Sequence, residues 1–211
     1  MILIKPSHKT LTEIDGIKIL KSIEAAGRTC YKSESKITDQ SAIKFVEGIL
    51  KSGHESVIEH ENISVRFICD RGVTHEIVRH RLAAYSQEST RYCNYKGGVT
   101  FIIPPWVDIK EGNYIRYYQK EDEVTEIWSR AMEYAETCYT TLIGNGWSPQ
   151  QARSVLPNSL KTEIVMTANV REWRHVLKLR TSKAAHPQMR ELMIPLLKEF
   201  QEKIPILFDD I

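Results

Sequence analysis

The chain has 211 residues, of which 42% are hydrophobic and 27% charged, and its formal net charge is +2. These values are typical of a folded globular protein with one substantial core, so we expect a single domain over residues 1–211. The near-neutral charge argues against a general affinity for nucleic acids or membrane surfaces, and an anion would have to bind at a local cluster of arginines.

Targeting signals and metal motifs are absent from the sequence. The N-terminal stretch MILIKPSHKT has no signal-peptide pattern, and no apolar run approaches the roughly 18 residues needed to span a bilayer. The four cysteines (Cys30, Cys69, Cys93 and Cys138) form no CxxC pair, which argues against a zinc site or a disulfide framework. We therefore expect a cytoplasmic protein with reduced thiols, no metal and no membrane association.

The first part of the chain predicts two helices between short strands. Residues 1–5 are expected to form a strand and residues 17–27 a helix, because apolar residues recur there at helical spacing. A second helix would be capped by Asp39 and end at Gly53. Residues 63–69 alternate apolar and polar side chains, which predicts a half-buried strand.

A helix beginning near Gly72 is then expected to carry residues 74–84. Residues 99–103 predict a strand that stops at the pair Pro104–Pro105.

The second half of the chain is expected to be mostly helical. A long helix is predicted from about Glu121 to Asn145, and a shorter one over residues 148–156, where Ser-Pro is a common start signal. The remaining elements are a strand at 162–168 and helices at 171–179 and 187–204. Helices around a small, mostly antiparallel sheet, with one long central helix, define an α+β class.

The segment from Arg79 to Tyr92 gathers three arginines, a histidine, two serines and two tyrosines. On the expected helix, Glu76 and Arg79 share a face, whereas Arg79 and Arg81 project in different directions. Arginine binds phosphate through a planar fork, and side-chain amides and hydroxyls suit the edge of a base. The segment therefore indicates a nucleotide site, and a solvated basic helix followed by a polar turn is the structural alternative.

The order of residues within this segment resembles a known signature. Arg79-His80-Arg81, followed after seven residues by Ser89, is similar to the motif of the flavin-dependent thymidylate synthases. Three other blocks of that family are matched in the same order, and the resemblance extends over about residues 20–200. They are Gly53–His60 (GHESVIEH), Ala152–Pro157 (ARSVLP), and Asn169–Trp173 (NVREW) with Leu179-Arg180 after it.

The resemblance implies a homotetramer whose active sites lie at subunit junctions and bind FAD and dUMP together. Carried over residue by residue, the FAD contacts are His54, Ser56, Arg79, His80, Arg81, Gln87, Asn169, Arg171 and His175. The dUMP contacts are Glu76, Arg79, Gln87, Glu88, Ser89, Thr90, Arg91, Arg153 and Arg180. Two stretches depart from the family pattern. Ser86-Gln87 replaces a common Asn-Glu, and Gln87 could reach either ligand. The stretch after Arg180 lacks a common His-Ala-Gln arrangement, and His186 within it is left unassigned.

The resemblance also implies a reaction. dUMP would be methylated to dTMP, with methylenetetrahydrofolate as the carbon donor and a hydride from FAD that NADPH has reduced. Arg180 would be the catalytic residue that favours ionisation of uracil N3, because a permanent cation stabilises a developing anion beside it. Ser89 is interpreted as a dUMP-binding hydroxyl and not a nucleophile, since the sequence places no base beside it.

Two other classes of protein compete with this interpretation. A metalloenzyme would use the clustered histidines, but His75 and His80 are five residues apart, a step of about 140° around a helix, so they would face apart. A nucleic-acid-binding module would use the arginines and the interleaved tyrosines. The near-neutral net charge of the chain argues against this class. The lack of a GxGxxG turn excludes only a Rossmann-type FAD site.

Overall fold

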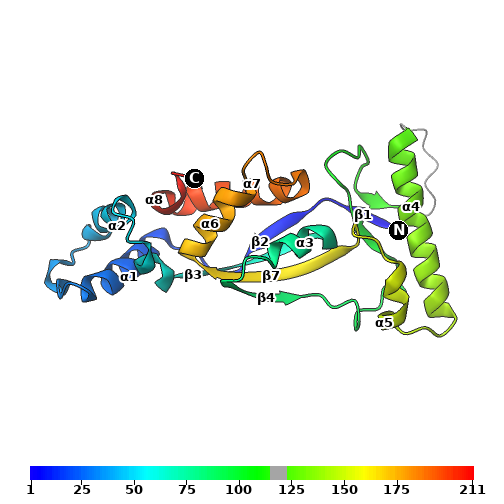
Figure 1. Ribbon diagram of the computed structural model, residues 1–211, viewed down its shortest axis with the longest axis horizontal. Coiled ribbons are helices and arrows are strands. Elements are labelled where there is room, and N and C mark those ends of the chain that lie inside the picture. The colour runs from blue at the N-terminus through cyan, green and yellow to red at the C-terminus, as the bar shows by residue number, and fades with distance from the viewer. Residues whose placement is uncertain (115–122) are drawn as a thin grey trace. The chain divides into compact units, whose positions relative to one another are not determined.

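The structure is a computed structural model that describes residues 1–114 and 123–211 (Figure 1). The chain forms two compact units, each assembled from separate segments of sequence. The first unit contains Met1–Ser7, Phe67–Arg79 and Ser86–Ile164. The second contains His8–Arg66, His80–Tyr85 and Val165–Ile211. The single domain expected for residues 1–211 stays a prediction.

A small sheet and a long helix build the first unit. Strand β1 (Ile2–Ile4) lies between β5 (Thr100–Ile102), to which it is parallel, and β6 (Gly112–Asn113), to which it is antiparallel. Their apolar side chains share one core with the inner face of α4 (Glu123–Gly144), where Leu3, Phe101 and Tyr139 are fully buried. The unit also contains α3 (Arg71–Ile77), α5 (Pro149–Ala152) and the 3₁₀ turn η3 (Arg153–Val155).

Helices form most of the second unit. Helix α1 (Gly16–Thr29) packs on α2 (Ser41–Lys51), with the 3₁₀ turns η1 (Glu34–Lys36) and η2 (Glu55–His60) following each of them. Helix α6 (Val170–Arg180) packs on α7 (Pro187–Lys203) and α8 (Pro205–Phe208). At this contact Trp173 meets Phe200 edge to face, with ring centroids 5.6 Å apart, and its indole N–H donates to the Ile63 carbonyl at 2.9 Å. Burial of these rings fixes α6 in place within the unit.

A second sheet has the strand order β2-β3-β7-β4. Its strands are β2 (Ser7–Thr10), β3 (Asn62–Asp70), β7 (Lys161–Asn169) and β4 (Ala83–Gln87). Burial alternates along β3 and β7, and for β3 the alternation of apolar and polar residues in the sequence predicted it. The predicted α+β class, with mostly antiparallel sheets and one long helix, is confirmed.

The helix expected over residues 74–84 is the main correction. Helix α3 ends at Ile77, with Val78 as its C-cap, and Ala83–Gln87 is strand β4. Pairing with β7, which continues in the hydrogen bond from Glu88 N to Glu163 O at 2.9 Å, outweighs the local helical pattern. Arg79, His80 and Arg81 therefore lie beyond the helix. Three expectations assumed that these residues were helical, and they do not apply. They are the shared face of Glu76 and Arg79, the divergence of Arg79 from Arg81, and the rotation of about 140° between His75 and His80.

Smaller corrections concern element ends. The N-cap of α2 is Gln40 and not Asp39, while Gly53 follows the C-cap Ser52 with a left-handed φ of 68° that glycine adopts without strain. Residues 148–156 form the short helix α5 and then a 3₁₀ turn, and the sequence did not predict β2, β6 or α8. The expected start of the long helix at Glu121 lies outside the described residues. Among the described helices, none is both long and apolar enough to cross a membrane.

Candidate active site

The predicted site residues divide between the two units largely by ligand. The first unit carries most of the residues assigned to dUMP: Glu76, Arg79, Gln87, Glu88, Ser89, Thr90, Arg91 and Arg153. The second carries most of those assigned to FAD, together with the catalytic candidate: His54, Ser56, His80, Arg81, Asn169, Arg171, His175 and Arg180. Only Arg180 of the dUMP residues lies in the second unit, and only Arg79 and Gln87 of the FAD residues lie in the first.

In the first unit, the segment after β4 meets the α5–η3 segment. Thr90 is buried, and its hydroxyl accepts a hydrogen bond from Arg153 Nη1 at 3.2 Å. The Ser89 hydroxyl accepts from the backbone N–H of Arg91 at 3.3 Å, and Arg91 Nε donates to the Gln150 side chain at 3.0 Å. The structure thus brings Arg153 to the segment that holds Arg91, and both arginines are exposed. Two anchored, exposed guanidinium groups are a suitable site for a phosphate.

Gln87 and Glu88 have partners within the same unit. The Gln87 amide donates to the hydroxyls of the buried residues Thr74 and Thr162, at 3.0 and 3.3 Å. A glutamate at position 87 could only accept hydrogen bonds, so the departure from the family pattern changes the direction of these contacts. The Glu88 carboxylate accepts from Lys161 at 3.0 Å and from the Tyr95 hydroxyl at 2.7 Å. Burial raises the pKa of Tyr95, and the bond to Glu88 raises it further.

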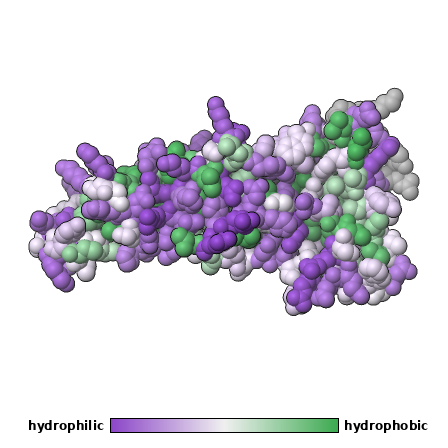
Figure 2. Space-filling model, viewed as in Figure 1, coloured by the Kyte–Doolittle hydropathy of each residue, from purple (hydrophilic) through white to green (hydrophobic). Residues whose placement is uncertain are grey.

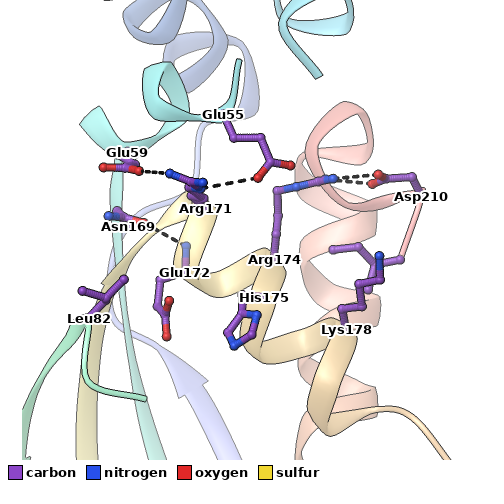
Figure 3. Close-up of a pocket in the computed structure, with 11 residues that line it drawn as sticks. Glu55, Glu59, Leu82, Asn169, Arg171, Glu172, Arg174, His175, Lys178 and Asp210 are labelled. Carbon is purple, nitrogen blue, oxygen red and sulfur yellow. Dashed lines mark hydrogen bonds and ion pairs between the residues drawn. The ribbon is translucent and has the colours of Figure 1, made fainter. Parts of the chain in front are cut away.

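The second unit contains a pocket of about 650 Å³ that is lined by η2, α6 and the last residues of the chain (Figure 3). Asn169, Arg171 and His175 line it, as do Arg174 and Lys178. Residues 174 and 175 lie three and four positions after Arg171, and Lys178 lies four and three positions after them, so the four share one side of α6. His54, Ser56 and Arg81 are exposed and are not among the described residues that line this pocket.

Carboxylates pair with two of the cations in this pocket. Arg171 contacts Glu59 at 2.6 Å and Glu55 at 3.4 Å, and Arg174 contacts Asp210 at 2.6 Å (Figure 3). An incoming anion would share or replace these carboxylates. Guanidinium and ammonium groups for a diphosphate, beside an amide and an imidazole for a heterocycle, fit a dinucleotide such as FAD, and the volume is in the range of ligand pockets.

His80 and Arg180 meet inside the second unit although they are 100 residues apart in sequence. Arg180 Nε donates to His80 Nε2 at 3.0 Å, and His80 Nδ1 lies 3.5 Å from a Glu172 carboxylate oxygen. Both His80 and Glu172 are buried, and the His175 ring meets the His80 ring edge-on at 5.8 Å. Burial, then Arg180 and His175, lowers the pKa of His80 to about 4, so the imidazole is neutral at pH 7. Because Nε2 accepts, the ring proton is on Nδ1 and faces Glu172.

Several of these residues were not predicted from the sequence. Glu172 lies within the matched block NVREW, and Glu55 and Glu59 lie within GHESVIEH, so the blocks themselves were the available signal. The helical spacing from Arg171 could have identified Arg174 and Lys178. Within the described parts of the chain, no group of three or more His, Cys, Asp or Glu side chains could hold a metal ion.

The chain can now be placed in a family. Residues 15–206 match the family described as Thymidylate synthase complementing protein, and the chain belongs to it. Two proteins named flavin-dependent thymidylate synthase are among its relatives. The one from Mycobacterium avium (strain 104) is 32% identical over 217 residues, covering 94% of this chain and 81% of its own. That from Mycobacterium tuberculosis (strain CDC 1551 / Oshkosh) is 33% identical over 212 residues, covering 97% and 84%.

A solved structure has the same fold. It is the UMP/dUMP methylase PolB from Streptomyces cacaoi bound with 5-Br dUMP, with a TM-score of 0.79 and coverage of 99% of this chain and 96% of that one. At 23% sequence identity this likeness shows the fold alone. The predicted membership of the flavin-dependent thymidylate synthase family, and with it the prediction of an enzyme, is confirmed.

Proposed function

We propose that this protein methylates dUMP to dTMP, using methylenetetrahydrofolate as the carbon donor, FAD as its bound cofactor and NADPH as the reductant of that cofactor. The observation that carries the proposal is the hydrogen bond between His80 and Arg180, because it joins two separate sequence blocks of the family in one buried arrangement. Relatives named flavin-dependent thymidylate synthase support the same activity.

Bound and reduced, FAD supplies the hydride for the transferred one-carbon unit. Asn169, Arg171 and His175 would hold it, because they line a pocket whose donors fit a dinucleotide. His54, Ser56, Arg79, Arg81 and Gln87 stay predicted FAD contacts. The protein's part is to bind, to orient and to place charge.

Arg180 is proposed to hold the uracil ring and to stabilise negative charge at N3. Its Nε atom is anchored by His80, which fixes the plane of the guanidinium, and its charge is permanent. A cation beside N3 favours the ionised ring, which is the more nucleophilic form at C5.

The dUMP phosphate is proposed to bind at Arg91 and Arg153, with the Ser89 and Thr90 hydroxyls beside them. The two ring nitrogens of His80 face Arg180 and Glu172, which supports a binding role for Ser89 and not a nucleophilic one that would require His80 as its base. Glu76, Arg79, Gln87 and Glu88 stay predicted dUMP contacts.

We further propose a cytoplasmic homotetramer in which each active site is completed by several subunits. Exposure of His54, Arg79 and Arg81 supports this, because exposed side chains can contact a ligand that another subunit holds.

The test begins under anaerobic conditions. FAD and then NADPH are added to the purified protein, and loss of the flavin's visible absorbance is followed. dUMP and methylenetetrahydrofolate are then added, and dTMP is measured. Bleaching followed by dTMP supports the proposal. Failure both to bind flavin and to form dTMP would overturn it and favour a nucleic-acid-binding module, for which the salt dependence of polynucleotide affinity is the next measurement.

A further inference from the structure

We infer that Glu172 is a positioning residue for Arg180 and acts through His80. Its carboxylate holds the ring proton of His80 on Nδ1, which keeps Nε2 as the acceptor for the Nε–H of Arg180. The catalytic consequence rests on the function proposed above, whereas the structural claim does not.

The three side chains form a chain of contacts inside the second unit. Glu172 is in the first turn of α6 and Arg180 in the last, and the His80 ring lies between their side chains. His80 is 5% exposed and Glu172 is 7% exposed, so water does not readily replace either contact. The Tyr85 hydroxyl donates to the His80 carbonyl at 2.8 Å and fixes the backbone that carries the ring.

Only one of the three protonation states of the imidazole suits this arrangement. An arginine Nε is always a donor, so a proton on His80 Nε2 would set two N–H groups against each other. A doubly protonated ring would do the same and would add a cation beside Arg180. The groups that face the ring from α6 are Glu172, His175 and Arg180, and the Glu172 carboxylate lies 3.5 Å from Nδ1, at an ion-pair distance.

The position of Arg180 therefore depends on Glu172. A guanidinium is planar and rigid, so a bond at Nε determines the direction of its terminal nitrogens. If the acceptor at Nδ1 were lost, the proton could move to Nε2, and Arg180 would turn away. We expect this to lower kcat more than it raises KM for dUMP, because the orientation of a charge matters most in the transition state.

Two matched variants test the inference. Glu172→Leu removes the acceptor and keeps an apolar side chain, whereas Glu172→Gln retains a carbonyl oxygen that can accept from Nδ1–H. Solid-state ¹⁵N NMR of the full-length, histidine-labelled protein at pH 7, with FAD added, reports which ring nitrogen carries the proton. The seven histidines are distinguished by the signal that His80→Gln loses.

We expect the Nδ1–H form in the wild type and in Glu172→Gln, and a shift toward the Nε2–H form in Glu172→Leu. We also expect Glu172→Leu to lower kcat about 10- to 100-fold, as loss of such outer partners commonly does, with Glu172→Gln restoring most of it. An Nε2–H form in the wild type, or an unchanged Nδ1–H form in Glu172→Leu, would overturn the inference.

If Glu172→Leu does not fold, Glu172→Met, which also lacks an acceptor for Nδ1–H, is measured in its place with the same expected and contrary results. The spectra need no turnover, so a wild type that makes no dTMP would count against the proposed function and not against this arrangement.

Discussion

At the residue scale, the proposed chemistry depends on one cation in a partly buried environment. Arg180 ends α6 and donates from Nε to a neutral imidazole. The signature histidine is buried, whereas Arg79 and Arg81 on either side of it are exposed.

Replacing Arg180 should remove catalysis and leave the fold. We expect Arg180→Ala to lower kcat about 10²- to 10³-fold, the usual effect of deleting one preorganised electrostatic group. Arg180→Lys keeps the charge but loses the planar fork, so its kcat should lie between those of the wild type and Arg180→Ala. Steady-state dTMP formation and far-UV circular dichroism measure both effects, and wild-type turnover in Arg180→Ala would remove Arg180 from its catalytic role.

The low pKa of His80 makes a prediction about stability. An unfolded histidine titrates near 6.5 and the buried one near 4, so between these values the unfolded state binds the proton and the native state does not. The free energy of unfolding should therefore fall as the pH is lowered from about 6.5 to 4, with His80 contributing a slope of up to about 1.4 kcal/mol per pH unit.

Urea unfolding of the wild type and of His80→Gln across this range isolates that slope. Burial raises the pKa of Glu172, so this carboxyl makes the free energy of unfolding rise as the pH is lowered. Both proteins contain Glu172, so the difference between their slopes reports the contribution of His80. Equal slopes in both proteins would contradict the prediction.

At the scale of elements, one predicted FAD contact also has a structural role. The Asn169 side chain accepts from the backbone N–H of Glu172 at 2.8 Å and caps α6 (Figure 3). The helix that carries Arg171, His175 and Arg180 therefore begins at a residue assigned to FAD, and the two roles need separate tests.

Asn169→Ala should lower the free energy of unfolding by about 1 kcal/mol without FAD, because an N-cap acceptor is lost. Asn169→Asp keeps an acceptor and adds a negative charge at the helix N-terminus, so its stability should be close to that of the wild type. Chemical denaturation of the flavin-free proteins measures this, and an Asn169→Ala protein as stable as the wild type would show that the cap contributes little.

Two helical glycines should respond to alanine in opposite ways. A Cβ on Gly27 would lie 2.6 Å from the Phe45 ring and 2.9 Å from Val57, where α1 packs on α2 and η2, whereas a Cβ on Gly48 meets nothing within 4 Å. Gly48→Ala should raise the free energy of unfolding by about 0.5–1 kcal/mol. Gly27→Ala should lower it by about 1–3 kcal/mol through overpacking. Thermal and urea unfolding of the two variants measure these changes. A Gly27→Ala protein more stable than the wild type would mean that the Phe45 ring moves aside at little cost.

At the scale of the whole molecule, the surface bears on assembly. Hydrophobic side chains reach the surface along the long helix α4, where Val124, Ile127 and Tyr134 are 72%, 62% and 71% exposed (Figure 2). Positions 127 and 134 are seven residues apart and lie on one face of the helix. Such a face is suited to contact with another subunit.

If active sites are shared between subunits, dilution below the dissociation range should abolish FAD binding and dTMP formation together. Mass photometry gives the oligomeric state, and flavin fluorescence and turnover are measured at the same concentrations. Ile127→Asp places a charge in the contact. It should therefore raise the protein concentration at which the oligomer forms, FAD binds and dTMP is made. Monomers with full activity would contradict the shared site.

Features that depend on near neighbours along the chain could be predicted from the amino-acid order. Alternation of apolar and polar residues located β3, helical spacing of apolar residues located α1, and residue order located the blocks of the family. Local sequence could not distinguish helix from strand at residues 78–87, because pairing with β7, a strand some 75 positions later, decides it. Tertiary structure alone joined Arg153 to Thr90, and Arg180 to His80 and Glu172. Those contacts depend on where the packed helices and sheets hold each backbone. The spacing of the residues along the chain does not predict the distances between their side chains.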